Sequence, residues 1–405
     1  MTQAAHPGAH PERLYFLDWL RAAAFGLLIL YHVGMYYVSW DWHIKSPHAG
    51  TTIEPLMMLS SPWRLALLFL ISGAATAMML KTKPGQPPRP FVRERSKRLL
   101  LPLLLAMLVV VPPQAYLEVV SKLSYQGSYL DFMQLYLKAY HGFCRGDDCL
   151  KLPTWNHMWF VAYLWVYSLL MWALLKAWPA ALDTMAALTE RHLKNAWGLW
   201  LLPVALLTLW RVLLVGRFPQ THALVDDFYN HALYLTVFLA GAVLARWGGG
   251  WALFARWRWV MLGLALLLWA AIASYFSYYS DALEPPDWLR QLQRLGYAAL
   301  QWSAIVAALG FAVRHWNHDH RWRATIAEAV FPVYLLHQTV IILLAWGMRP
   351  WDLAPSIEAP LLIVGTAVVC VAGYLVATRL GPLRPWFGLA PRALPPAAVI
   401  APATA

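Results

Sequence analysis

The sequence has few charged residues and very few cysteines. Only 13% of its 405 residues are Asp, Glu, Lys or Arg, whereas 60% are hydrophobic. This balance excludes an ordinary soluble globular protein, and it excludes a disordered chain, which has little apolar content. Three cysteines are too few for a disulfide-rich secreted scaffold. A phosphate-binding loop and a dinucleotide-binding fingerprint are also missing.

Long apolar segments are what the sequence has instead. Ten runs are long enough to cross the hydrocarbon core of a bilayer, and 24 tryptophans suit the membrane–water interfaces between them. The runs lie at about 15–39, 62–80, 99–120, 157–178, 196–216, 227–246, 258–279, 296–313, 324–347 and 358–379. The sequence therefore predicts an all-α integral membrane protein with about ten transmembrane helices.

The chain is expected to form one membrane domain between two tails. Residues 1–14 are predicted as an N-terminal tail, 15–380 as the ten-helix domain, and 381–405 as a flexible C-terminal tail. The last stretch of this tail, "PRALPPAAVIAPATA", is low-complexity. The first apolar run is about 25 residues long, beyond a typical signal-peptide core, and no A-x-A cleavage site follows it. We expect this run to remain as the first span.

Basic residues predict the orientation. Twenty of the 32 Lys and Arg residues lie in the tails and the even-numbered connectors, against nine in the odd-numbered connectors. The positive-inside rule therefore places both termini in the cytoplasm. The net charge of +12 then reflects topology and contacts with anionic membrane lipids, and no nucleic-acid partner is expected.

Two cysteines share one polar loop, "GFCRGDDCLKL", which the charge count places outside the membrane. Cys144 and Cys149 are five residues apart, so a small disulfide is possible in an oxidising compartment. The alternative is a pair of free thiols. No metal site is expected, because no second cysteine pair accompanies this one.

Ionisable side chains inside an apolar segment are costly in a bilayer and are therefore functional candidates. Arg21 and His32 lie eleven residues apart in the first span, so they share one helix face and are about 16 Å apart along the axis. The alternative for Arg21 is a structural ion pair with Asp18, three residues earlier.

Further candidates lie toward the outer half of the predicted bundle. For each single histidine among them, the alternative is a purely structural role, as a core residue hydrogen-bonded to a hydroxyl group. The candidates from the fourth and ninth spans and from the stretch after the first span are His157, His337, Asp41, Trp42 and His43.

A basic helix start leads into the third span. In "FVRERSKRLLLP", Arg93, Lys97 and Arg98 are close in helical phase and, with Arg21, predict an anion pocket at the cytoplasmic face. The alternative is a cluster that contacts lipid phosphates.

These stretches together resemble the membrane acyltransferase-3 family. "FLDWLRAAAFGLLILYH" resembles the arginine–ten residues–histidine motif of the family's first span, "FLISG" its F-x-x-S-G element, "FVRERSKRLLLP" its basic start of span three and "VYLLHQ" its late Y-x-x-H element. "SWDWHIKS", "HMWFVAYL" and "FYNHALYLTVFLAGAVLA" look most like the glucan biosynthesis protein C branch, which succinylates periplasmic glucans.

The resemblance implies an O-acyltransferase of the bacterial inner membrane. It would move an acyl group from cytoplasmic acyl-CoA to a hydroxyl of a periplasmic glucan or another cell-envelope glycan. Arg21, Arg93, Lys97 and Arg98 would bind the CoA phosphates, and a neutral His32 would act as general base.

The resemblance does not assign the acyl donor, the path of transfer or the residues that bind the oxyanion and the acceptor. The acyl-CoA co-substrate is succinyl-CoA or acetyl-CoA, no bound cofactor is implied, and transfer is either direct or through an acyl-His32 intermediate. A polytopic transporter or flippase for a glycan or lipid-linked sugar is the alternative function. The possible oxyanion or acceptor residues are Ser72, His337, His157, Asp41, His43 and Trp42.

Overall fold

The computed structural model describes residues 14–81, 90–192, 196–247, 249–279 and 283–391. Most of the predicted N-terminal tail, the Pro/Gly-rich part of the basic connector (82–89) and residues 392–405 of the predicted C-terminal tail lie outside the described residues.

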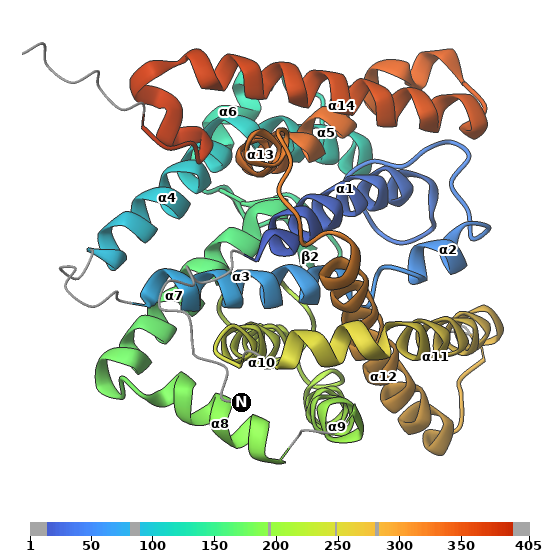
Figure 1. Cartoon of the computed structure of the whole chain (residues 1–405). Coiled ribbons are helices and arrows are strands. Elements are labelled where there is room, and N and C mark those ends of the chain that lie inside the picture. Colours follow the sequence, from blue (N-terminus) through green and yellow to red (C-terminus); the bar gives the residue numbers. More distant parts are fainter. Residues whose placement is uncertain (1–13, 82–89, 193–195, 248, 280–282, 392–405) are drawn as a thin grey trace, which may run out of the picture.

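The described chain is a bundle of helices with one short β-hairpin (Figure 1). The helices are α1 (Tyr15–Tyr37), α2 (Glu54–Met58), α3 (Arg64–Leu80), α4 (Phe91–Leu105), the π-helix η1 (Ala106–Val110), α5 (Pro112–Leu123), α6 (Tyr129–Leu137), the 3-10 helix η2 (Asn156–Met158), α7 (Trp159–Ala177), α8 (Ala181–His192), α9 (Ala196–Leu214), α10 (Phe228–Leu244), α11 (Gly250–Tyr278), α12 (Asp287–His315), α13 (Arg323–Met348), η3 (Arg349–Trp351), α14 (Pro355–Arg379) and η4 (Gly381–Phe387).

Seven helices of the described chain are long and apolar enough to cross a membrane. The two helices on either side of Val111, which meet at an angle of 41°, would make an eighth span if they count as one. Each of the ten predicted apolar runs coincides with a helix, but α3 and α10 have only 17 residues each. The helical, multi-pass character is confirmed, while the count of ten spans and the cytoplasmic termini stay predictions.

Proline explains the bend in the third predicted span. Pro112 and Pro113 begin α5, and a proline supplies no backbone N–H to the preceding helical turn. The turn before them has widened to the π-helix η1, Ala106–Val110. The chain therefore changes direction at Val111 without leaving the bundle.

Helix α1 is central to the bundle. It contacts α3 and also α12, α13 and α14, which come from the C-terminal part of the chain. Figure 1 shows α14 along one side of the molecule and α9, α11 and α12 toward the opposite side, with α1, α3 and α13 between them. The residues on α1 are therefore surrounded by protein over much of their length.

Two glycines allow α3 and α10 to pack backbone against backbone. A Cβ atom at Gly73 would collide with the carbonyl oxygen of Phe238, and one at Gly241 would collide with that of Leu70. Small residues permit such close helix contacts in a membrane, where packing drives helix association. This contact holds α3 and α10 together as a closely packed pair.

The chain after α14 differs from the predicted free tail over residues 381–391. Helix η4 packs against α4, α13 and α14, and Leu389 is buried. Arg384 anchors the segment, since its guanidinium pairs with Glu328 at 2.9 Å and donates to the carbonyl of Thr378 at 2.8 Å. The composition of residues 381–405 does not indicate this anchor.

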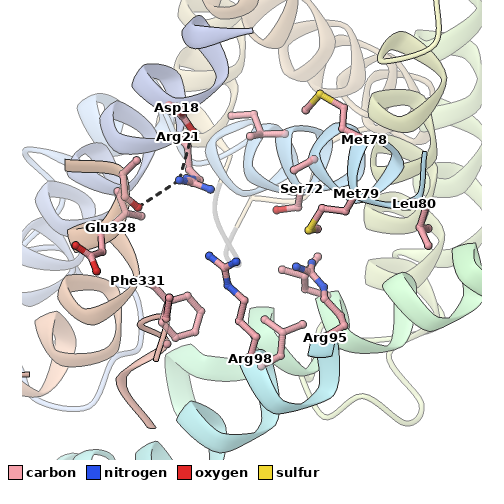
Figure 2. Close-up of a pocket in the computed structure, with 18 of the residues that line it drawn as sticks. Asp18, Arg21, Ser72, Met78, Met79, Leu80, Arg95, Arg98, Glu328 and Phe331 are labelled. Atoms are coloured by element: carbon pink, nitrogen blue, oxygen red, sulfur yellow. Dashed lines mark hydrogen bonds and ion pairs between the residues drawn. The ribbon is translucent and has the colours of Figure 1, made fainter. Parts of the chain in front are cut away.

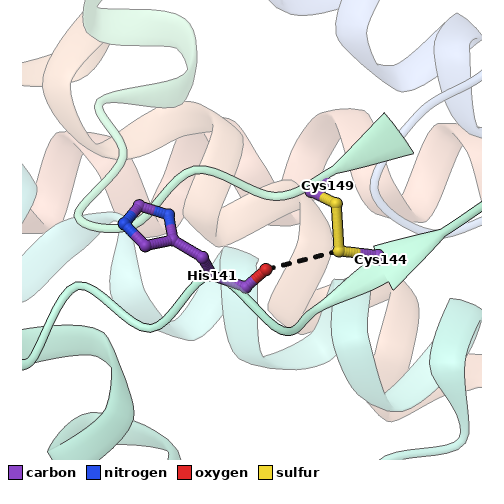
Figure 3. The surroundings of a disulfide bond; sticks show 3 residues. All are labelled: His141, Cys144 and Cys149. Carbon is purple, nitrogen blue, oxygen red and sulfur yellow. Dashed lines mark hydrogen bonds between the residues drawn. A yellow bond between two sulfur atoms is a disulfide. The ribbon is translucent and has the colours of Figure 1, made fainter. Parts of the chain in front are cut away.

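The short hairpin carries the paired cysteines. Strands β1 (Cys144–Arg145) and β2 (Asp148–Cys149) are antiparallel, and a disulfide joins Cys144 to Cys149 (Figure 3). Gly146 turns the chain between them with a positive φ of 61°. The third cysteine, Cys370, is a buried free thiol in α14.

The hairpin tests both the redox state and the orientation. Protein extracted without reductant and alkylated should carry no alkyl group on Cys144 or Cys149, and peptide mass spectrometry should recover both in one linked peptide. After reduction in whole cells, a membrane-impermeant maleimide should label them from the periplasmic side, which is the side predicted from charge. Alkylation of both thiols without reductant would remove the disulfide, and labelling only from the cytoplasm would invert the topology.

The α3–α10 contact predicts a severe effect of one methyl group. Gly73→Ala should sharply lower the yield of folded protein, because the new Cβ meets backbone that has no alternative position. Gly263→Ala is the matched control, since a Cβ there meets nothing within 4 Å. The measurement is the monodisperse peak in fluorescence-detected size-exclusion chromatography. Equal yields of the two variants would show that α3 and α10 are not in backbone contact.

Candidate active site

Two histidines from distant parts of the chain face each other in the centre of the bundle. His32 on α1 and His337 on α13 lie with Nδ1 and Nε2 2.8 Å apart, and their rings stack at 5.0 Å with an interplanar angle of 13°. His337 is fully buried, His32 is half-buried, and the indole of Trp42 stacks on the His32 ring at 6.5 Å. The structure thus brings three of the predicted site residues, His32, His337 and Trp42, next to one another.

The hydrogen bonds assign the protons of the neutral pair. The Nδ1 atom of His337 lies 2.6 Å from the carbonyl oxygen of Tyr334, and a carbonyl only accepts, so His337 carries its proton on Nδ1. Its Nε2 must then accept the proton that His32 carries on Nδ1. The Nε2 atom of His32 is left with a lone pair. A neutral imidazole with one committed donor and one free lone pair is the form that acts as a general base.

His157 completes the cluster but is itself fully engaged. Its ring lies perpendicular to that of His337 at 5.1 Å. Its Nε2 donates to the carbonyl of Leu335 at 3.2 Å, and its Nδ1 faces the amide of Gln114 at 3.5 Å. Gln114 in turn donates to the hydroxyl of Thr339 at 2.6 Å. These bonds hold His157 in place as a wall of the site.

A second polar chain leads from α13 toward the loop after α1. The amide of Gln338 donates to Nε2 of His43 at 2.8 Å, so the Nδ1–H of His43 points to Glu118, 2.5 Å away. Lys122 then bridges Glu118 and Asp41 at 2.9 Å each. The predicted residues Asp41 and His43 therefore belong to one ion-pair network, and Glu118 and Lys122 are members that the sequence did not indicate.

A large cavity opens near the start of α1 (Figure 2), with a volume of about 1020 Å³. Phe25, Phe160 and Tyr334 line its apolar part, and their rings contact one another at 5.0–6.4 Å. Because the Tyr334 carbonyl holds His337, this aromatic group lies between the cavity and the histidine pair. The cavity is strongly basic. Its cationic residues are Arg21, Lys81, Arg95, Arg98, Lys176 and Arg323.

The structure brings together only part of the predicted anion pocket. Arg21 and Arg98 line the basic cavity, whereas Arg93 and Lys97 are exposed and do not. Arg95 lines it instead, and its Nε donates to Ser168 at 3.0 Å. The signal was present in the sequence, because Arg95 precedes the buried Leu99 by one helical turn.

Arg21 remains able to bind an anion despite its neighbouring carboxylate. Asp18 lies 3.6 Å from Arg21 but 2.8 Å from Arg323, so one carboxylate serves two guanidinium groups. Nη2 of Arg21 donates to the carbonyl of Ala327, and its buried Nε has no hydrogen-bond partner in the described chain. The ion pair that was the alternative interpretation of Arg21 is therefore present, and the cavity still has an excess of positive charge.

Ser72 lines the basic cavity on α3, beside Arg95 and Met79 (Figure 2). It is not in the hydrogen-bond network of the histidines. The "FLISG" stretch therefore contributes a small polar group to the cavity and, through Gly73, the close contact with α10.

A second cavity, of about 1260 Å³, lies beyond the other end of α1. It is lined by Trp40, Asp41 and Lys45, by Trp155 and by the Cys149 strand. Lys45 donates to two backbone carbonyls at 2.6 and 2.7 Å, and its burial lowers the pKa of its ammonium group to about 8. Indole rings beside polar and charged groups are well suited to bind a carbohydrate.

The acyltransferase-3 domain family, described as an acyltransferase domain, matches residues 14–375. The chain belongs to the acyltransferase-3 family. This family and the apolar helices together indicate a membrane acyltransferase.

More distant matches give partial relatives. The glucans biosynthesis protein C of Escherichia coli strain SMS-3-5 and that of Shigella dysenteriae serotype 1 are each 25% identical over 161 residues, and that of E. coli K12 is 24% identical over 161 residues. Each match spans 39% of this chain and 38% of the relative's length. No solved structure matches the chain.

Proposed function

We propose that this protein is an O-acyltransferase that moves an acyl group from acyl-CoA in the basic cavity to a hydroxyl of a glycan in the second cavity. The observation that carries the proposal is the position of His32, between two cavities at opposite ends of α1. That helix has 23 residues and spans roughly 34 Å, about the thickness of a bilayer core.

The proposed setting is the bacterial inner membrane. We propose ten spans, with α3, α10 and the bent α4–α5 pair counted, and both termini in the cytoplasm. The basic cavity then opens to the cytoplasm, where acyl-CoA is found, and the disulfide hairpin lies on the periplasmic side. The acceptor is a periplasmic glucan or another envelope glycan, and the acyl group is succinyl or acetyl.

The donor site is the basic cavity. The phosphates of CoA need several cations, and guanidinium groups bind phosphate through paired hydrogen bonds. Arg21, Arg95 and Arg98 converge there from α1 and α4 (Figure 2). Arg93 and Lys97 extend the same positive face of α4 toward the surface. The pantetheine arm would follow the apolar part of the cavity toward Phe25.

The chemistry needs only groups that the chain and substrates supply. The acceptor oxygen attacks the thioester carbon, the C–O bond forms, and the C–S bond breaks. Nε2 of His32 takes the hydroxyl proton and passes it to the CoA thiolate. His337 holds His32 in the productive tautomer, and His157 positions His337. Ser72 or a nearby backbone N–H group stabilises the oxyanion that forms on the thioester oxygen.

The acceptor site is the second cavity. Trp40 and Trp155 offer faces on which sugar rings stack. The ion-pair network of Asp41, His43 and Lys122 supplies hydrogen bonds to sugar hydroxyls, and Trp42 lies between this network and His32.

A transporter or flippase is the second candidate. Two cavities separated by contacting aromatic rings also suit alternating access. The two functions differ in product, because an acyltransferase releases free CoA and esterifies the glycan, whereas a transporter leaves the thioester intact. Thiol release from labelled acyl-CoA therefore separates them.

Charge reversal in the basic cavity should weaken donor binding. Arg98→Glu should raise the KM for acyl-CoA by roughly 10-fold or more, because it replaces a charge-assisted hydrogen bond with repulsion. Arg93→Glu is the matched control on the same helix, with a smaller effect expected since Arg93 does not line the cavity. The measurement is initial-rate kinetics with varied donor. An unchanged KM in Arg98→Glu would assign this cluster to lipid contact.

Loss of the proposed base should strongly lower turnover without unfolding the protein. His32→Ala should lower kcat by about 100-fold or more, the usual contribution of a positioned base. His337→Ala should lower kcat less and leave the donor KM unchanged. His231→Ala is the control, because this half-buried histidine bonds Tyr167 and Leu224 outside the site. Turnover of His32→Ala near that of the wild type would exclude the general-base role.

A further inference from the structure

Arg64, the first residue of α3, is a buried cation that lacks a counter-ion in the part of the chain that the structure describes. Only 6% of the residue is exposed, and its Nε and Nη1 atoms have no hydrogen-bond partner there. Its guanidinium carbon lies 3.2 Å from the centroid of the Tyr31 ring. A ring face stabilises a cation only partly, so a buried guanidinium in this state is strongly favoured by an added anion.

The surroundings of Arg64 belong to the histidine site. Tyr31 immediately precedes His32 on α1, and Arg64 is close enough to His32 for a Coulombic interaction. Tyr234 and Tyr297 also lie within range of its charge. The positive end of the α3 dipole adds to the same potential. An anion bound here would therefore sit next to the group that we propose as the base.

We propose that Arg64 binds a carboxylate at the far end of the transferred acyl group, which makes the protein selective for short dicarboxylic acyl groups of the succinyl type. This inference rests on the proposed function. In a succinyl thioester two methylene groups separate the reacting carbonyl from the carboxylate. A base and an anion receptor in neighbouring positions fit this molecule, whereas an acetyl group has nothing to offer Arg64.

Two half-buried arginines of the bundle, whose buried Nε atoms also have no hydrogen-bond partner in the described chain, differ from Arg64. Arg211 also stacks on a tyrosine ring, that of Tyr297, but its Nη1 donates to the hydroxyl of Tyr229 at 2.9 Å. Arg258 donates to the carbonyl of Ala255. Arg64 combines deep burial, two unpartnered nitrogens and proximity to His32. Arg64 makes no covalent bond in the proposed step, whose atoms and protons remain as described above.

The test compares two donors on the full-length protein in nanodiscs. Arg64→Gln should lower kcat/KM for succinyl-CoA by roughly 10- to 100-fold, as expected when a charged hydrogen bond is lost, and leave that for acetyl-CoA within about 2-fold. Arg64→Lys should retain part of the preference. Arg258→Gln should change neither donor. Binding of unreactive thioether analogues of both donors, measured by calorimetry, should show the same selective loss.

Each other outcome has a distinct meaning. Equal losses with both donors would overturn the inference and give Arg64 an oxyanion-stabilising or structural role. Wild-type protein that uses acetyl-CoA and does not prefer succinyl-CoA would overturn it while the proposed function stands. Wild-type protein that releases CoA from neither donor would remove the proposed function. In that case an equal affinity of wild type and Arg64→Gln for the succinyl analogue would also remove the carboxylate site.

Discussion

The hydrogen bond between His32 and His337 joins α1 to α13 inside the bundle, across 305 residues of sequence. It works only because the carbonyl of Tyr334 fixes the proton on the far side of His337, which turns two similar rings into a donor and an acceptor. In a low-dielectric interior such a chain of bonds is strong when every member is satisfied and costly when one is not. The free lone pair of His32 depends on this one orientation.

The two cavities differ in how their charges are paired. In the basic cavity the arginines of α1 and α4 outnumber the carboxylates near them, and Asp18 is shared between two guanidinium groups. In the second cavity Lys122 bridges Glu118 and Asp41, while Lys45, Arg145 and Lys151 add further positive charge. Both cavities therefore carry an excess of basic residues, and the ion-pair network of the second presents hydrogen-bond donors and acceptors side by side.

The sequence predicted what depends on local periodicity. The apolar runs fall on helices, and the eleven-residue spacing predicts that Arg21 and His32 share one face of α1. In the structure Arg21 lines the basic cavity and His32 faces His337. Partners distant in sequence had no comparable signal. Glu118 reaches His43 across 75 residues, and Arg64 on α3 stacks on Tyr31 on α1. On α4, charge alone does not separate Arg95 and Arg98, which line the cavity, from Arg93 and Lys97, which do not. The composition of the C-terminal tail does not indicate the single arginine, Arg384, that anchors residues 381–391.

The break between η1 and α5 has an effect beyond the change of direction. Proline removes donors, so carbonyl oxygens in the preceding turn become available to other side chains. Met107 offers its carbonyl to the hydroxyl of Tyr136 on α6 at 2.8 Å, and Val110 offers its own to the hydroxyl of Thr339 on α13 at 2.6 Å. Hydrogen bonds to carbonyl oxygens at the kink therefore hold two other helices, α6 and α13. Without the two prolines, backbone N–H groups of α5 would compete for the carbonyl oxygens of this turn, and the polar layer beside the histidines would share its attachment with the helix backbone.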